Sequence, residues 1–68
     1  MTIINKRLGQ RIRKYRIEQG ITQEEAAYRA NLDYSYFNQI EKGKRNPSVK
    51  ALARIARTLR VSLKQLFE

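Results

Sequence analysis

The stretch Thr22–Ser48 reads TQEEAAYRANLDYSYFNQIEKGKRNPS, and it decides how this chain folds. Thr22 and Glu25 have the spacing of a capping box, in which each side chain satisfies a free backbone N–H of the other residue. This spacing predicts a helix that begins at Thr22 and ends near Ala30.

A further helix is predicted after only three residues, 31–33. Asp33 is suited to cap that helix, which we expect to run to about Lys42 and to end at Gly43. Two helices joined by so short a turn cross steeply, so the second helix projects from the body. A helical hairpin in any small bundle has the same turn, so the turn by itself does not identify a function.

Upstream of this stretch, the sequence predicts a helix from Ile3 or Asn5 to about Gln19. Its apolar residues recur at spacings of four, four and three, which is one helical face: Ile4, Leu8, Ile12 and Tyr15. Gly20 follows as the residue that ends the helix, because a positive φ costs glycine little.

Downstream, residues 44–47 form a loop and Ser48 caps a fourth helix. The apolar face of that helix is Ala51, Leu52, Ile55, Ala56 and Leu59. Ser62 and Gln65 have capping-box spacing for a short last helix. No segment alternates with period two, so the sequence predicts an all-α fold of five short helices in a single domain, residues 1–68.

The chain is strongly basic. Its 68 residues include 15 Lys and Arg against six Asp and Glu, which gives a formal charge of +9 and a pI near 10.5. A basic domain of this size suits a polyanionic partner, namely DNA, RNA or an anionic membrane. The alternative is a basic surface that only keeps the protein in solution.

Missing residue types exclude several classes of site. The chain has no cysteine and no histidine, which removes disulfides, thiolate metal sites, the commonest zinc ligand and the commonest general base. We therefore expect no enzyme, no metal, no cofactor and no small-molecule ligand. No apolar run approaches the roughly 20 residues of a membrane span, and the N-terminus lacks a signal peptide, so we expect a cytoplasmic protein with no membrane partner.

The projecting helix carries short polar and aromatic side chains in its N-terminal half rather than a hydrophobic stripe. The major groove of DNA admits one α-helix, and base edges offer donors and acceptors to such side chains. A projecting helix fits that groove better than the deep, narrow groove of A-form RNA. The pattern therefore favours double-stranded DNA as the partner.

Three motifs together resemble one protein family: TQEE at 22–25, IEKGKRNPS at 40–48 and VSLKQLF at 61–67. Over residues 8–67 the chain is similar to the lambda-repressor/Cro-type (XRE) helix-turn-helix family. The resemblance implies a compact five-helix DNA-binding domain, with the helix-turn-helix formed by the second and third helices over about residues 22–42. The segment Asn31-Leu32-Asp33 and the aromatic-rich helix after it are most similar to controller proteins of restriction–modification systems.

The resemblance also implies which side chains of the third helix read DNA bases. Tyr34, Ser35 and Asn38 match the positions that point at base edges. Gln39 is a further candidate, which could instead point to phosphate or to the flank. Asn pairs bidentately with adenine, and Ser accepts from or donates to several bases. For each of these residues the alternative is a surface position without a role in recognition.

Phosphate contacts are implied at both ends of the motif. Gln23 begins the second helix, where an amide and free backbone N–H groups can grip a phosphate. The resemblance sets the loop after the third helix along the DNA backbone, with contacts from Lys42, Lys44, Arg45 and Asn46. Tyr36 stays open between two roles, because its hydroxyl could reach a phosphate or its ring could pack against the first helix. Arg11, Arg13 and Lys14 could add long-range attraction without direct contact.

Arg16 and Glu41 match a pair that bridges the first and third helices in this family. An arginine fork that meets a carboxylate fixes the relative orientation of two helices. This match implies that Glu41 is structural, although it lies next to the residues implied in DNA reading.

Arg60 departs from the family pattern, in which glycine or asparagine often stands where the fourth helix ends. An arginine there must adopt a left-handed conformation, or the turn differs. This turn and the last helix often form the dimer interface in relatives, so the dimer candidates are Arg60, Val61, Leu66 and Phe67. The sequence does not divide the apolar ones between core and interface.

These residues predict a sequence-specific transcriptional regulator, which represses, activates or does both. One recognition helix contacts too few base pairs to discriminate within a genome, so a homodimer on a pseudo-palindromic operator is expected. The alternative is a protein-binding module such as an antitoxin, with DNA binding secondary.

Overall fold

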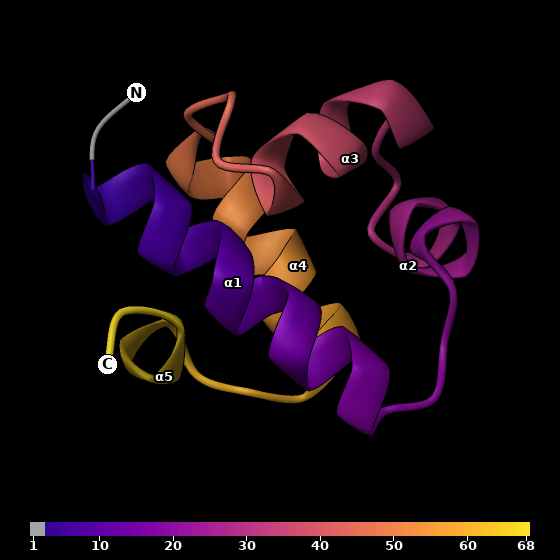
Figure 1. Ribbon diagram of the computed structural model, residues 1–68. Coiled ribbons are helices and arrows are strands. Elements are labelled where there is room, and N and C mark those ends of the chain that lie inside the picture. The colour runs from indigo at the N-terminus through magenta and orange to yellow at the C-terminus, as the bar shows by residue number, and fades with distance from the viewer. Residues whose placement is uncertain (1–2) are drawn as a thin grey trace.

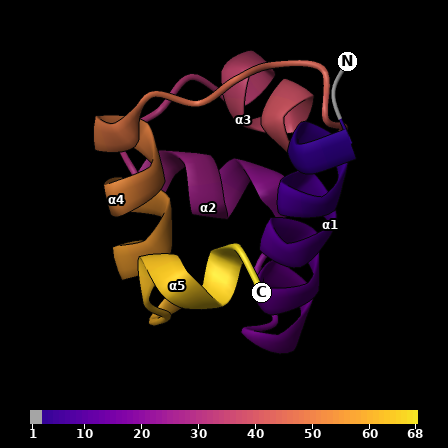
Figure 2. The ribbon, with the colours of Figure 1, turned by 90° about the vertical axis from the view of Figure 1, so that its left-hand side faces the viewer.

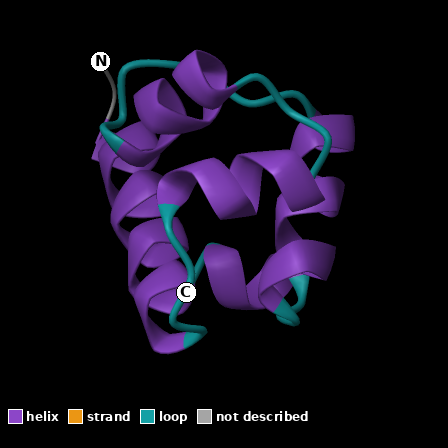
Figure 3. Ribbon diagram, turned by 90° about the vertical axis from the view of Figure 1, so that its right-hand side faces the viewer, coloured by secondary structure: helices purple, strands orange, loops and turns teal. Residues whose placement is uncertain are grey.

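The protein is all-α, as the helical periodicity predicts. The computed structural model describes residues 3–68. Its helices are α1 (Ile3–Glu18), α2 (Gln23–Arg29), α3 (Tyr34–Glu41), α4 (Val49–Leu59) and α5 (Leu63–Leu66) (Figure 1). Every predicted helix is present, and residues 3–68 contain no strand (Figure 3).

Hydroxyl and carboxylate side chains begin four of the helices. Those of Thr22, Asp33, Ser48 and Ser62 each accept a hydrogen bond from a backbone N–H in the first turn. At Ser62 the predicted capping box is complete, because the Ser62 backbone N–H also donates to Gln65 Oε1 at 2.8 Å. The helix starts thus follow from local sequence.

The capping box predicted at Thr22 and Glu25 is only half formed. The Glu25 N–H donates to Thr22 Oγ1 at 3.1 Å, as expected. The Glu25 carboxylate instead accepts from Arg29 Nε at 2.6 Å, one turn further along α2. A carboxylate bonds more strongly to a guanidinium than to a neutral backbone N–H, so it faces Arg29.

Residues with positive φ follow four of the helices, and Gly43 is the one that follows α3. Gly20, with φ of 73°, follows α1, and Asn31, with φ of 56°, follows α2, both as predicted. Arg60 follows α4 with φ of 59° and ψ of 40°. The chain therefore keeps a left-handed turn at Arg60, in a conformation that an arginine adopts less readily than glycine or asparagine.

The largest fully buried side chains come from α1, α3, α4 and α5: Ile12, Phe37, Ile40, Ile55, Leu59 and Leu66. Phe37 and Ile40 are the inward residues predicted for the third helix, and burial confirms that prediction. α3 and α5 lie at opposite ends of the molecule, with α1 running along both (Figure 2). No helix within residues 3–68 is long and apolar enough to cross a membrane.

Two glycines let α3 lie directly on α1. A Cβ added to Gly9 would overlap the backbone carbonyl of Glu41 and lie 2.5 Å from that of Ile40. Gly43 has φ of +73°, and a Cβ there would lie 2.9 Å from the Cα of Lys6. The end of α3 therefore rests against the α1 backbone at a distance that excludes any larger residue.

Candidate nucleic-acid interface

The turn between α2 and α3 consists of residues 30–33. The Leu32 N–H donates to the Ala27 carbonyl at 2.9 Å, and the left-handed Asn31 redirects the chain. In Figure 1, α2 is seen almost end-on while α3 runs across the view, so the two helices cross steeply, as predicted. α3 thus lies at the edge of the molecule with one face outward.

The outward face of α3 carries the four side chains implied in base reading: Tyr34, Ser35, Asn38 and Gln39. Tyr34 and Ser35 are exposed, and Asn38 and Gln39 are half-buried. Phe37, Ile40 and Glu41 on the same helix are buried. The structure therefore brings the four candidates together on the accessible side of one helix.

Gln39 is held by exposed neighbours. Its Nε2 donates to Ser35 Oγ at 3.4 Å, and its Oε1 accepts from Arg45 Nη1 at 3.3 Å. The Arg45 guanidinium also lies over the Tyr36 ring, 5.2 Å from the centroid, which is a cation–π distance. Arg45 therefore folds back onto α3 from the loop that follows it.

Tyr36 makes a contact that neither of the two roles left open by the sequence included. Its half-buried ring packs against the hydrophobic core, and its hydroxyl accepts from the Ser48 N–H at 3.2 Å. Ser48 caps α4, so the hydroxyl connects α3 to the start of α4 rather than to α1. The hydroxyl hydrogen is not used in this bond and can still be donated.

Arg16 and Glu41 form the ion pair that bridges α1 and α3. Arg16 Nε lies 2.6 Å from Glu41 Oε2, and Nη2 lies 3.3 Å from Oε1. Arg16 Nη1 also donates to the Ile21 carbonyl at 2.8 Å. The side chains are only 12% and 3% exposed, so solvent cannot replace either partner if one is removed.

Gln23 occupies the start of α2, but its amide is bonded within the protein. Nε2 donates to Glu41 Oε1 at 2.8 Å, and Oε1 accepts from Asn38 Nδ2 at 2.9 Å. The Tyr34 hydroxyl donates to the same Oε1 at 3.4 Å. The sequence did not predict these bonds, because they depend on how α2 crosses α3.

The loop after α3 carries exposed side chains suited to phosphate: Lys42, Lys44, Arg45 and Asn46. The Lys44 N–H donates to the Gln39 carbonyl at 2.9 Å, so the loop leaves α3 in a defined direction. Gly43, which directs this exit, is buried against α1. The cations therefore flank the outward face of α3.

Arg11 makes direct contacts that the sequence did not predict. Its Nη2 donates to the Tyr15 hydroxyl at 2.8 Å and to the Gln65 carbonyl at 3.2 Å, and lies 3.6 Å from a Glu68 carboxylate oxygen. Arg11 therefore bridges α1 to α5 and the residues after it. Arg11 and Tyr15 are four residues apart on one helix, so the sequence could have indicated their contact. Nothing in the local pattern indicates the contacts of Arg11 with Gln65 and Glu68.

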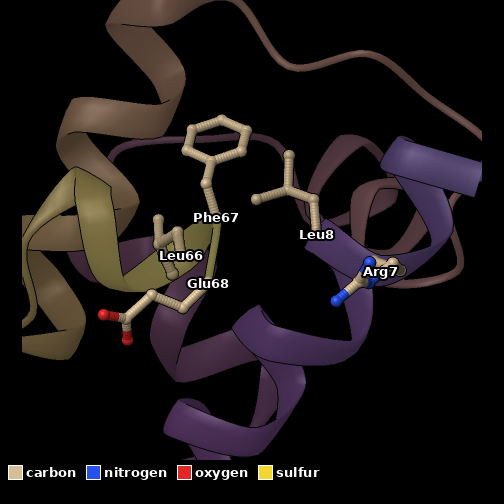
Figure 4. A pocket seen from close by; sticks show the side chains of 5 residues that line it. All are labelled: Arg7, Leu8, Leu66, Phe67 and Glu68. Atoms are coloured by element: carbon tan, nitrogen blue, oxygen red, sulfur yellow. The ribbon is translucent and has the colours of Figure 1, made fainter.

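The structure divides the dimer candidates. Leu66 is 0% exposed and belongs to the core, so its assignment to an interface was wrong. Phe67 is 56% exposed, Arg60 is exposed and Val61 is half-buried. Phe67 borders a pocket of about 240 Å³ between α1 and the chain end, together with Arg7, Leu8, Leu66 and Glu68 (Figure 4).

Comparison with known proteins identifies relatives of this arrangement. A family model described as helix-turn-helix matches residues 12–66. The control protein C.MunI of Mycoplasma sp. is 38% identical over 68 residues, which covers 98% of this chain and 92% of that protein. A helix-turn-helix transcriptional regulator of Sinorhizobium fredii is 37% identical over 59 residues, or 87% of this chain and 77% of its own.

A solved structure has the same fold. The restriction–modification controller protein C.AhdI from Aeromonas hydrophila superposes with a TM-score of 0.89 at 35% identity. The match covers 91% of this chain and 94% of that one. The resemblance seen in the sequence motifs is therefore confirmed at the level of both sequence and fold.

Proposed function

This chain belongs to the helix-turn-helix family of DNA-binding transcriptional regulators, and from that membership we propose that it acts as a homodimer on a pseudo-palindromic operator. Its similarity to controller proteins supports a narrower proposal, that it controls genes of a restriction–modification system. Repression or activation would follow from where the operator lies relative to the promoter. Because its partner would be chromosomal DNA, we propose a cytoplasmic location.

The observation that carries this proposal is the outward face of α3. Tyr34, Ser35, Asn38 and Gln39 lie on one accessible face of a helix whose other face is buried. Hydroxyls and amides are the groups that read base edges in the major groove. The Arg16–Glu41 pair and Gly9 fix this helix on α1, so those groups would meet DNA in a set orientation.

Phosphate contacts would hold the protein in register on the duplex. The exposed cations Lys42, Lys44 and Arg45 and the side chain of Asn46 are candidates for these contacts, together with the Tyr36 hydroxyl. Gln23 would add a phosphate contact through its backbone N–H and the second hydrogen on Nε2. The net charge of +9 favours each of these contacts and would make binding salt-dependent.

Dimerisation would use the surface around the end of α4 and the residues after α5. The exposed Phe67 ring supplies apolar area there, with Arg60 and Val61 in the adjacent turn. A two-fold dimer carries two recognition helices, which read half-sites about one turn of DNA apart. Two half-sites give the discrimination that a single short helix lacks.

Selection of bound sites from random duplex DNA, at near-physiological salt, tests the proposal. We expect an inverted repeat with half-sites about one helical turn apart. Absence of any enriched motif, with binding that fades steeply as salt rises, would contradict it and would favour a protein-binding module.

A matched pair of variants separates base reading from phosphate binding. Asn38→Ala should weaken binding to the selected site by about 1–3 kcal/mol and hardly affect random DNA. Lys44→Ala should weaken binding to all sequences and lower the salt slope by about one unit. Equal losses for Asn38→Ala on both DNAs, or an unchanged slope for Lys44→Ala, would contradict the assigned roles.

A further inference from the structure

A continuous chain of hydrogen bonds runs from the buried ion pair to the outward face of α3. It begins at Arg16 on α1, passes through Glu41 on α3 to Gln23 on α2, and returns to Asn38 on α3. The successive bonds measure 2.6, 2.8 and 2.9 Å. The chain therefore joins a charged group in the interior to a side chain implied in base reading.

The direction of this chain is set by Glu41. An ionised carboxylate only accepts hydrogen bonds, so the Gln23 atom facing it must be Nε2. Gln23 Oε1 then faces the other way, and Asn38 must offer an Nδ2 hydrogen to it. If the Gln23 amide turned over, Oε1 would face the carboxylate and Nε2 would face the Nδ2 donor of Asn38.

Burial prevents water from relaxing this constraint. The Glu41 side chain is 3% exposed, and Oε1 accepts from both Arg16 and Gln23. If the Gln23 amide turned over, Glu41 Oε1 would lose one of its two donors and face a second acceptor, with no water to take the place of the lost donor. The amide orientation of Gln23 is therefore a consequence of the ion pair and not of the exposed surface.

From this geometry we infer that Gln23 is a positioning residue that makes Asn38 select adenine at the base it reads. Glu41 holds the Gln23 amide with Oε1 toward Asn38, and this acceptor holds the Asn38 amide with Oδ1 toward DNA. One Nδ2 hydrogen of Asn38 is bonded to Gln23, which leaves Oδ1 and the other hydrogen for DNA. In the major groove adenine offers an N6 donor beside an N7 acceptor, whereas guanine offers two acceptors. An amide held with Oδ1 outward pairs with adenine and repels guanine O6. This inference rests on the proposed function, because it requires that α3 reads bases.

Gln39 provides the contrast on the same face. Its amide bonds to Ser35 and Arg45, which are both exposed, at 3.4 and 3.3 Å. These bonds are longer than those of Asn38, and no buried charge sets their direction. The inference is therefore confined to Asn38.

The experiment compares adenine with guanine at the half-site position whose preference is lost in Asn38→Ala. Gln23→Met keeps the length and the apolar stem of the side chain and removes the amide. We expect the preference for adenine over guanine to fall about fivefold, the equivalent of one hydrogen bond. Loss of the proposed Nε2 contact with phosphate should weaken binding to every duplex by a common factor, so the ratio of affinities for adenine and guanine is the quantity that tests the inference. Gln10→Met, on the exposed surface of α1, is the matched control and should change neither quantity.

A double variant tests whether Gln23 acts on the adenine preference through Asn38. In an Asn38→Ala background, Gln23→Met should have no further effect on the preference for adenine.

Two outcomes would overturn the inference. Equal loss of affinity for every duplex in Gln23→Met would assign Gln23 to phosphate alone, and an additive double variant would mean that it acts independently of Asn38.

A side-chain amide measurement in the free protein keeps the test independent of DNA. We expect one Asn38 Nδ2 hydrogen to exchange slowly with solvent, and to exchange faster in Gln23→Met. If the original protein showed no sequence preference while that slow exchange remained, the proposed function would fail, but the orientation of Asn38 by Gln23 would be confirmed.

Discussion

α1 contacts α3 and α5 through two junctions that are built in opposite ways. The α1–α3 junction consists of Gly9, Gly43 and the Arg16–Glu41 pair. There the backbones approach so closely that a Cβ on Gly9 would overlap the Glu41 carbonyl. The ion pair that closes the junction is 12% and 3% exposed.

The α1–α5 junction consists of Arg11, Tyr15, Gln65 and Glu68. It is made by one long side chain that reaches a hydroxyl, a carbonyl and a carboxylate. The Arg11 and Glu68 side chains are 26% and 53% exposed, and Arg11 Nε is buried without a hydrogen-bond partner. Water can therefore compete for much of this junction, and one polar atom in it is left unsatisfied.

The difference between the two junctions follows from the side chains that α3 and α5 expose at the surface. α3 presents polar side chains that must meet a partner in a set orientation, and a backbone contact with a buried charge pair allows little movement. α5 has only four residues, and the exposed Phe67 lies beside it. A loosely held apolar end suits a surface that is completed by a second copy.

The largest effect should come from breaking the buried pair. Glu41→Ala leaves Arg16 uncompensated and 12% exposed, so we expect a loss of about 3–4 kcal/mol in the free energy of unfolding. Chemical denaturation measures this loss. Glu68→Ala, the same change at the other junction, should cost less than about 1 kcal/mol. Similar losses in the two variants would mean that the junctions do not differ.

Gly9→Ala should have the next largest effect, about 2–3 kcal/mol, because the new Cβ meets backbone atoms that cannot turn aside. Gly20→Ala is the control. A Cβ at Gly20 has no neighbour within 4 Å, so only its positive φ opposes the change, at about 1 kcal/mol. Thermal and chemical unfolding would rank the two variants. A milder effect at Gly9 than at Gly20 would contradict the close approach of α1 and α3.

Removing the bridge at the other junction should cost about 1 kcal/mol, since the bonds of Arg11 are partly exposed. Arg11→Ala should release α5 and the Phe67 beside it, so the proposed dimer should weaken while unfolding changes little. Sedimentation at several protein concentrations would measure dimerisation. A variant that dimerises normally would show that α5 does not depend on Arg11 for its position.

The smallest effect concerns the two left-handed turns. Arg60→Gly should stabilise the protein by about 0.5–1 kcal/mol, because glycine adopts φ of 59° without strain. Asn31→Gly at the turn before α3 should gain less, because asparagine already tolerates this conformation. Denaturation midpoints would resolve the two changes. If Arg60→Gly lost stability, the arginine side chain would have to make a compensating contact.

Much of the proposed base-reading surface followed from local sequence. Asp33 begins α3, Phe37 and Ile40 point inward, and the remaining positions are outward by the geometry of a helix. The bonding partners of those outward side chains could not be predicted from local sequence. Tyr36 bonds to the start of α4, which is twelve residues away.

The sequence by itself determined the helices, their caps, the left-handed Asn31 and the inward residues, because capping, turn preference and periodicity act within about one or two helical turns. Only the tertiary structure decided that Gln23 bonds to Glu41 and Asn38, and that Leu66 is buried while Phe67 is exposed. Such contacts depend on the crossing of whole helices, which shifts an amide or a ring by several ångströms without any change in local pattern.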